Sequence, residues 1–224
     1  MRLKLLAASL MLTAASTSFI YPKTTSTRVD AAPCVVGRTA APIGFWTWPA
    51  NSQVNIYLRV PDFSEDYVAA VRLAVEGWDA AAIENGSNVH FSFRGLTRET
   101  TAAYGDVTII RGDVYSKKKR LAELEAHSLK SNQLIDYAFV VVDPRVKAPE
   151  VLTNIVVHEL GHSLGLLDCN SCSHKGSAMS LLKAANESNG IEGPTACDKI
   201  AVLSVYRDLA RHVRATSTDI TALR

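Results

Sequence analysis

Residues 158–162 constrain this chain more than any other segment, because they place two histidines and a glutamate in the order His-Glu-Leu-Gly-His. Residues four apart lie on one face of an α-helix, so His158 and His162 can direct both imidazoles at one ion. Glu159 lies one position further round the helix, where its carboxylate can reach a water at an open coordination position without binding the ion itself. The segment therefore predicts a helix that carries a metal site, and imidazoles are common ligands of zinc.

The residues after this helix supply a candidate third ligand. A catalytic zinc ion usually has three protein ligands and one open position. Gly165 can adopt the left-handed conformation that ends a helix and turns the chain back, and Asp168 then follows with a carboxylate. His174 in the same loop is an alternative ligand, and Cys169 and Cys172 would be softer ones if they were reduced. The spacing from Gly165 favours Asp168.

The first residues of the chain have the pattern of a secretory signal peptide. Arg2 and Lys4 precede an apolar stretch from Leu5 to Ala15, and small residues follow it. This stretch is too short for a permanent transmembrane helix. We therefore expect a signal peptide at residues 1–18 and a secreted protein, extracellular or periplasmic. Residues 19–44, rich in Thr, Ser, Ala and Pro, are expected to form an N-terminal arm or prosegment.

Export affects how the four cysteines are interpreted. An even number of cysteines in an oxidising compartment favours disulfides, and four cysteines allow three connectivities. Cys169 and Cys172 could instead form half of a zinc knuckle, but the sequence has no second Cys-X-X-Cys pair. Two disulfides are the better interpretation.

The remaining sequence predicts one α+β domain, because 224 residues suit a single hydrophobic core. Alternating or continuous apolar residues predict strands, and apolar residues three and four apart predict helices. The charged stretch 117–125 is expected to be a helical turn or an exposed loop. Strands are expected at 53–60, 89–93, 106–111 and 134–142, and helices at 64–83, 149–164 and 194–210. This order indicates helices packed around a mixed sheet.

The segment 158–180 resembles the metzincin clan of metalloproteases. In that clan His, Glu, His, Gly and a third ligand recur at the spacing found here. Most members have histidine as the third ligand, and Asp168 is similar to the snapalysin-type minority. The clan also has a methionine in a tight turn below the metal, and Met179 lies where that turn belongs. Leu181 stands where astacins and serralysins have a metal-binding tyrosine, so no such ligand is expected.

The resemblance implies a zinc metalloprotease catalytic domain at residues 45–215. The fold would be metzincin-like, with a twisted mixed sheet, a long N-terminal helix, an active-site helix and a C-terminal helix. An extended peptide would lie along the edge strand of the sheet, beside an apolar pocket near the Met179 turn. The implied site consists of Zn²⁺ on His158, His162 and Asp168, with Glu159 as general base and with Gly165 and Met179 as structural residues.

The expected cysteine pairs are Cys34–Cys197 and Cys169–Cys172. The second pair would close a short loop directly after Asp168 and hold that loop in place. The first pair is left by elimination, and it agrees with the resemblance because the mature N-terminus of matrixins packs near the C-terminal helix. The alternative is a free Cys34 that caps the zinc in a latent precursor, although the charged residues that flank such a cysteine are missing here.

These features together predict a secreted zinc-dependent endopeptidase. Its rivals are an exported zinc-binding module and a zinc hydrolase that acts on other bonds, and Glu159 argues against a purely structural zinc site. A formal net charge of +2 gives no reason to expect a nucleic acid or membrane partner. The basic run 117–120 has no interleaved aromatic residues and is expected to be solvated. We expect a monomer that binds a peptide or protein substrate, without nucleic acid and without stable membrane insertion.

Overall fold

The computed structural model describes residues 33–221, apart from 130–132, 174, 182–183 and 186. The expected signal peptide at 1–18 and His174 lie outside these residues. Pro33 and all later described residues belong to one unit, Ala32–Arg224.

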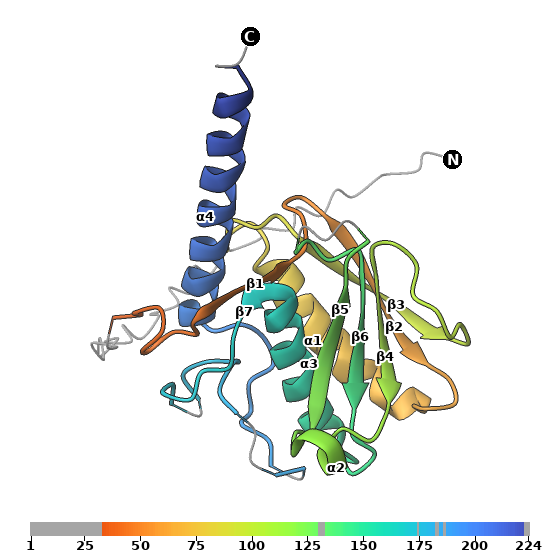
Figure 1. Cartoon of the computed structure of the whole chain (residues 1–224). Helices are drawn as coiled ribbons and strands as arrows, with labels where there is room; N and C mark the ends of the chain where they lie inside the picture. The colour runs from red at the N-terminus through yellow and green to blue at the C-terminus, as the bar shows by residue number, and fades with distance from the viewer. Residues whose placement is uncertain (1–32, 130–132, 174, 182–183, 186, 222–224) are drawn as a thin grey trace, which may run out of the picture. The chain divides into compact units, whose positions relative to one another are not determined.

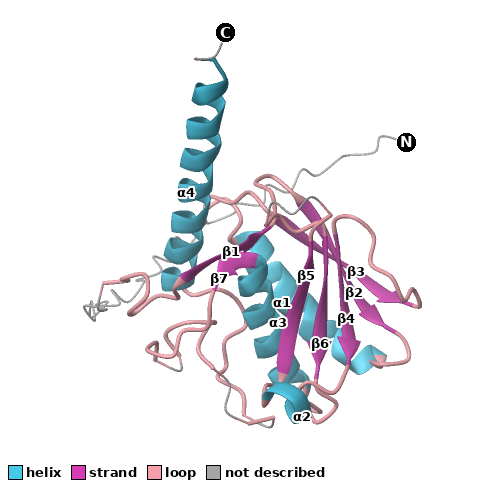
Figure 2. Cartoon of the chain, viewed as in Figure 1, coloured by secondary structure: helices cyan, strands magenta, loops and turns pink. Residues whose placement is uncertain are grey.

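The elements are a mixture of strands and helices (Figures 1 and 2). In chain order they are β1 Ile43–Thr47, β2 Gln53–Arg59, a 3₁₀ turn Glu65–Tyr67, α1 Val68–Ala80, β3 His90–Thr97, β4 Asp106–Arg111, α2 Tyr115–Lys118, β5 Ala122–His127, β6 Tyr137–Val142, α3 Pro149–Ser163, β7 Leu164–Leu166 and α4 Ala196–Thr221.

The main sheet has five strands in the order β3-β2-β4-β6-β5. The first four run parallel, and β5 pairs antiparallel with β6 from Ala122↔Val142 to His127↔Tyr137. In β2 every second side chain is buried, as an alternating sequence predicts. In β6, which lies between β4 and β5, the apolar run YAFVVV is buried at four of its six positions, as its continuous apolar sequence predicts.

Helices α1 and α3 pack against each other and cover one face of this sheet (Figure 1). Trp78 on α1 is fully buried, and its indole Nε1 donates a hydrogen bond to the Val157 carbonyl of α3 at 2.8 Å. Every residue of α3 from Val151 to Gly161 is buried. This burial keeps the histidine-bearing helix fixed against the core, which is a condition for a preorganised site.

A second, two-stranded sheet pairs β1 antiparallel with β7, directly after α3. Ala40 and Ala41, before β1, are fully buried. The described part of the expected arm, residues 33–44, therefore contributes to the core of the same unit and to β1.

The structure differs from the sequence-based expectations in several elements. Residues 122–127 form the edge strand β5, although 117–125 was expected to be a turn or loop. The dense charge before Ala122 obscured the alternation in Ala-Glu-Leu-Glu-Ala-His, which is a strand pattern. Strands β1 and β7 were also missed, and β7 is only three residues long. The last helix continues to Thr221, beyond the expected end near residue 210.

Candidate metal centre

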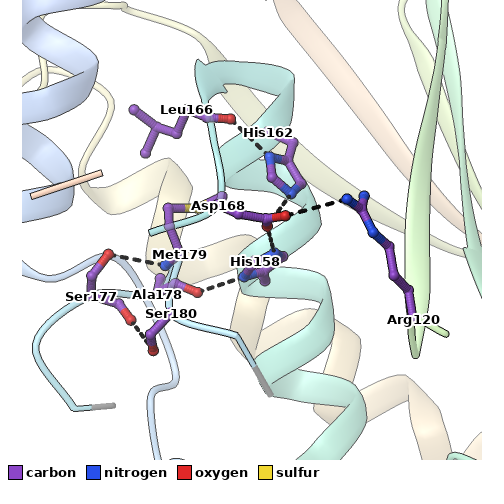
Figure 3. Close-up of polar contacts among 9 residues, drawn as sticks. All are labelled: Arg120, His158, His162, Leu166, Asp168, Ser177, Ala178, Met179 and Ser180. Carbon is purple, nitrogen blue, oxygen red and sulfur yellow. Dashed lines mark hydrogen bonds and ion pairs between the residues drawn. The ribbon is translucent and has the colours of Figure 1, made fainter. Parts of the chain in front are cut away.

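Helix α3 carries His158 and His162 on one face, and both rings are oriented by backbone carbonyls (Figure 3). His158 Nδ1 is 2.9 Å from the Ala178 carbonyl oxygen, and His162 Nδ1 is 2.8 Å from the Leu166 carbonyl oxygen. Because a carbonyl oxygen can only accept, each Nδ1 must carry the proton that it donates. In the neutral rings, each Nε2 then presents a lone pair, which is the form of histidine that binds a metal.

Asp168 completes the group of converging ligand atoms (Figure 3). Its Oδ1 lies 3.1 Å from His158 Nε2 and 3.3 Å from His162 Nε2. Two imidazole lone pairs and an anionic oxygen at these distances require a positive charge between them, either a proton or a metal ion. The three groups together match the nitrogen and oxygen ligands that zinc accepts, so the residues present fit a metal ion.

Glu159 lies next to the two histidines in the same buried region. The ligand atoms of His158, Glu159 and His162 all lie within 4.8 Å of one another. Glu159 is 5% exposed, and its Oε2 has no hydrogen-bond partner among the described residues. A buried carboxylate oxygen left unpaired is costly. An ion or a water beside the histidines would supply the missing partner.

Gly165 turns the chain after α3 so that Asp168 can reach the histidines. Its φ of +86° lies in the left-handed region, where residues with a Cβ are rarely found. A Cβ at this position would also come within 2.8 Å of Val205 Cγ1 on α4. Position 165 therefore requires glycine for two reasons: the backbone has a positive φ, and Val205 leaves no room for a Cβ.

The turn around Met179 lies beside His158 and contacts both ligand-bearing segments (Figure 3). Met179 is fully buried, and a Cβ on Gly161 of α3 would clash with its Sδ. The carbonyl of Ala178 orients His158, and the carbonyl of Met179 accepts from the backbone N–H of Cys169 at 2.8 Å, next to Asp168. The turn thus supports both the helical ligand and the loop ligand.

Asp198 anchors this turn, and sequence analysis missed it. Its fully buried carboxylate accepts hydrogen bonds from the backbone N–H groups of Ala178, at 2.8 Å, and Thr195, at 2.9 Å. It also accepts from the hydroxyls of Ser177 and Thr195. Neither Ala178 nor Asp198 carries a signal in the sequence, because their roles depend on contacts through space.

The electrostatics of the three ligand groups follow from their contacts. In the metal-free site, the contacts of Asp168 with His158 and His162 act as hydrogen bonds to its carboxylate and hold the pKa of Asp168 far below its ordinary value. Burial alone would lower the pKa of His162, but its hydrogen bond to Asp168 and the charge of Glu159 outweigh burial and raise that pKa. The Arg120 guanidinium also lies near Asp168 and brings a positive charge to it, with Nη2 3.6 Å from Asp168 Oδ2 (Figure 3). Ionised Asp168 is the form that binds a metal ion.

Two cavities adjoin the candidate metal centre on its two sides and share Arg120, Glu159, His162 and Asp168. The cavity next to α2 has a volume of about 370 Å³, and we call it the α2-side cavity. The cavity next to β1 has a volume of about 490 Å³, and we call it the β1-side cavity. Residues of β5 line both. A substrate along β5 would therefore cross the candidate metal centre.

The structure contains the two disulfides expected from the sequence, Cys34–Cys197 and Cys169–Cys172. The first joins the segment before β1 to the start of α4, and the second closes the loop after Asp168. Ser171 in this loop also donates a hydrogen bond to the Arg38 carbonyl at 2.8 Å. Disulfides of this kind are typical of oxidising, extracellular-type compartments. Among the described residues, no helix has the length and apolar character needed to span a membrane.

The two disulfides should differ in their effect on stability. The Cys34–Cys197 bridge joins residues 163 apart in sequence, whereas the other bridge joins residues 3 apart. Loop-closure entropy then predicts a loss of about 3 kcal/mol or more for Cys34→Ser/Cys197→Ser and about 1 to 2 kcal/mol for Cys169→Ser/Cys172→Ser. Urea unfolding of both double variants measures this difference. Equal losses would contradict the entropic explanation.

Comparisons with known proteins add little to this geometry. No family model matches the sequence, and no curated protein matches it. The solved structure titled "Structure of Myroilysin" is similar to 55% of this chain and 44% of that chain, with 18% sequence identity and a TM-score of 0.31. The matched part is less than half of the myroilysin chain. A similarity of this size is too weak to carry fold or function, so the interpretation of the site depends on its own residues.

Proposed function

We propose that this protein is a secreted zinc-dependent endopeptidase with a metzincin-like site. The observation that carries the proposal is the arrangement of Glu159 beside three converging ligand groups, His158, His162 and Asp168, at the junction of two cavities. A purely structural zinc site is closed by its ligands and needs no base. The unpaired, buried carboxylate therefore favours a catalytic site over a zinc-binding module.

In this proposal the residues of the chain have separate roles. His158, His162 and Asp168 would hold the zinc ion, which when bound polarises a carbonyl group and lowers the pKa of water. Glu159 would accept a proton from the attacking water and pass it to the departing amine. Both steps need a carboxylate close to the ion, and the ligand atom of Glu159 lies within 4.8 Å of those of both histidines.

The edge strand β5 supports a peptide as the substrate. It has β6 on one side and no neighbouring strand on the other within the described residues. An extended peptide can pair with the free edge of a sheet through backbone hydrogen bonds alone. An ester or a sugar has no repeating backbone amides and cannot pair with the edge in this way.

Activity measurements with and without a chelator test the proposal. The purified protein should contain one zinc ion per chain and cleave casein, lose both properties in 1,10-phenanthroline, and recover both when zinc is returned. Casein cleavage that persists after complete loss of zinc would contradict the proposal. Bound zinc without cleavage of casein or any peptide would favour the zinc-binding module or the non-peptidase hydrolase.

A further inference from the structure

The α2-side cavity has an unusual concentration of positive charge. Three consecutive cations, Lys118, Lys119 and Arg120, line it at the end of α2 and the start of β5. Among the described residues that line it, the carboxylates are Glu159 and Asp168, and both belong to the candidate metal centre. Outside that centre, the described lining of the cavity therefore has a net positive charge.

These three cations differ in how far they are paired. Lys118 forms an ion pair with Glu123 on β5. Arg120 is 55% exposed, and among the described residues it forms an ion pair with Asp168, at 3.6 Å. Lys119 lies with Nζ 5.1 Å from the centre of the Tyr115 ring and has no carboxylate within ion-pair distance among the described residues. Lys119 thus remains available to an anionic group that enters the cavity, and the exposed guanidinium of Arg120 can bind a second anionic group beside Asp168.

The β1-side cavity has the opposite character. Glu123 and Glu125 of β5 line it, together with the exposed apolar side chains of Trp46 and Leu167. Arg120 is the one Lys or Arg side chain among the described residues of its lining. The charge along the chain therefore changes sign from Lys118–Arg120, before β5, to Glu123 and Glu125 within β5, so an acidic side chain is favoured on one side of the candidate metal centre and disfavoured on the other.

We infer that the α2-side cavity is a specificity site for an acidic side chain, and that Lys119 and Arg120 select peptides with Asp or Glu on that side of the cleaved bond. The inference rests on the proposed peptidase function and adds to it the class of substrate. A volume of about 370 Å³ is ample for one such side chain. The cations lie on the rim, where exposed charges mainly improve discrimination and the rate of association.

A set of matched fluorogenic peptides tests the inference. Each peptide carries a single Asp, Asn or Lys at one position on either side of the cleaved bond, which mass spectrometry of the products identifies. We expect kcat/KM to be about fivefold higher for Asp than for Asn on one side of the bond only. High salt should reduce this ratio, because exposed charges are screened. Equal values for Asp and Asn on both sides would overturn the inference.

The variant Lys119→Asp locates the effect, and Lys117→Asp is its matched control. Lys119 has a φ of +57°, a left-handed conformation that Asp tolerates better than most residues. Lys117 is an exposed lysine of the same run that lines neither of the two cavities. The Asp-to-Asn ratio should fall about fivefold in Lys119→Asp and stay unchanged in Lys117→Asp. An equal fall in both variants would overturn the inference, because the net charge alone would then explain the preference.

The outcomes separate this inference from the proposed function. Cleavage of the Asn peptides without any preference for Asp leaves the peptidase function intact and contradicts the specificity site. Zinc-loaded protein that cleaves no peptide of any charge contradicts both.

Discussion

Replacement of Glu159 by Ala should lower kcat/KM for peptide cleavage by about 10²- to 10⁴-fold while the protein keeps its zinc. General acid–base groups contribute rate factors of about this size. Glu159 lies beside both histidines with one carboxylate oxygen unpaired, so it is placed to handle protons. Measurements of kcat/KM and of zinc per chain on the same preparation test both halves of the expectation.

Glu159→Gln is the matched control for this experiment, because it keeps the size of the side chain and removes its basicity. It should lose as much activity as Glu159→Ala. A variant that stays active would refute Glu159 as the base, whereas loss of zinc from both variants would show that Glu159 is a ligand.

The features of the site that could be predicted from sequence are those that depend only on residues close together in the chain. The helical positions of His158 and His162 follow from the helix period, and the role of Gly165 follows from its conformational freedom. The structure has both features, with α3 ending at Ser163 and Gly165 at a φ of +86°. The alternating strand β2 and the apolar strand β6 were predictable for the same reason.

The part that could not be predicted depends on contacts between distant segments. Asp198 supports the Met179 turn across a separation of 20 residues, and the Ala178 carbonyl orients His158 across the same separation. A backbone carbonyl has no sequence signature, and a buried aspartate looks like a surface one until its partners are known. The edge strand β5 was missed because its alternation is short and follows four consecutive basic residues.

These distant contacts also decide which loop residues can act as ligands. The N–H of Cys169 is bound to the Met179 carbonyl, and the N–H of Leu167 is bound to the Pro42 carbonyl at 2.8 Å. Asp168 lies between these two backbone anchors, so its carboxylate is held toward the histidines with little freedom to move away. The disulfide Cys169–Cys172 begins at the next residue and restricts the loop further.

Replacement of Asp168 by Ala should therefore lower the affinity for zinc by more than about 100-fold. Loss of a group that only supports a ligand already costs about 10- to 100-fold, and Asp168 is in our proposal a direct ligand. Its Oδ1 lies within 3.3 Å of both histidine Nε2 atoms. Titration against a chelating indicator measures the affinity, and circular dichroism checks that the variant is folded.

His174→Ala is the control, because His174 is the alternative ligand that the sequence allows. This variant should bind zinc like the unaltered protein. If Asp168→Ala keeps its zinc and His174→Ala loses it, His174 is the third ligand and the assignment of Asp168 is wrong.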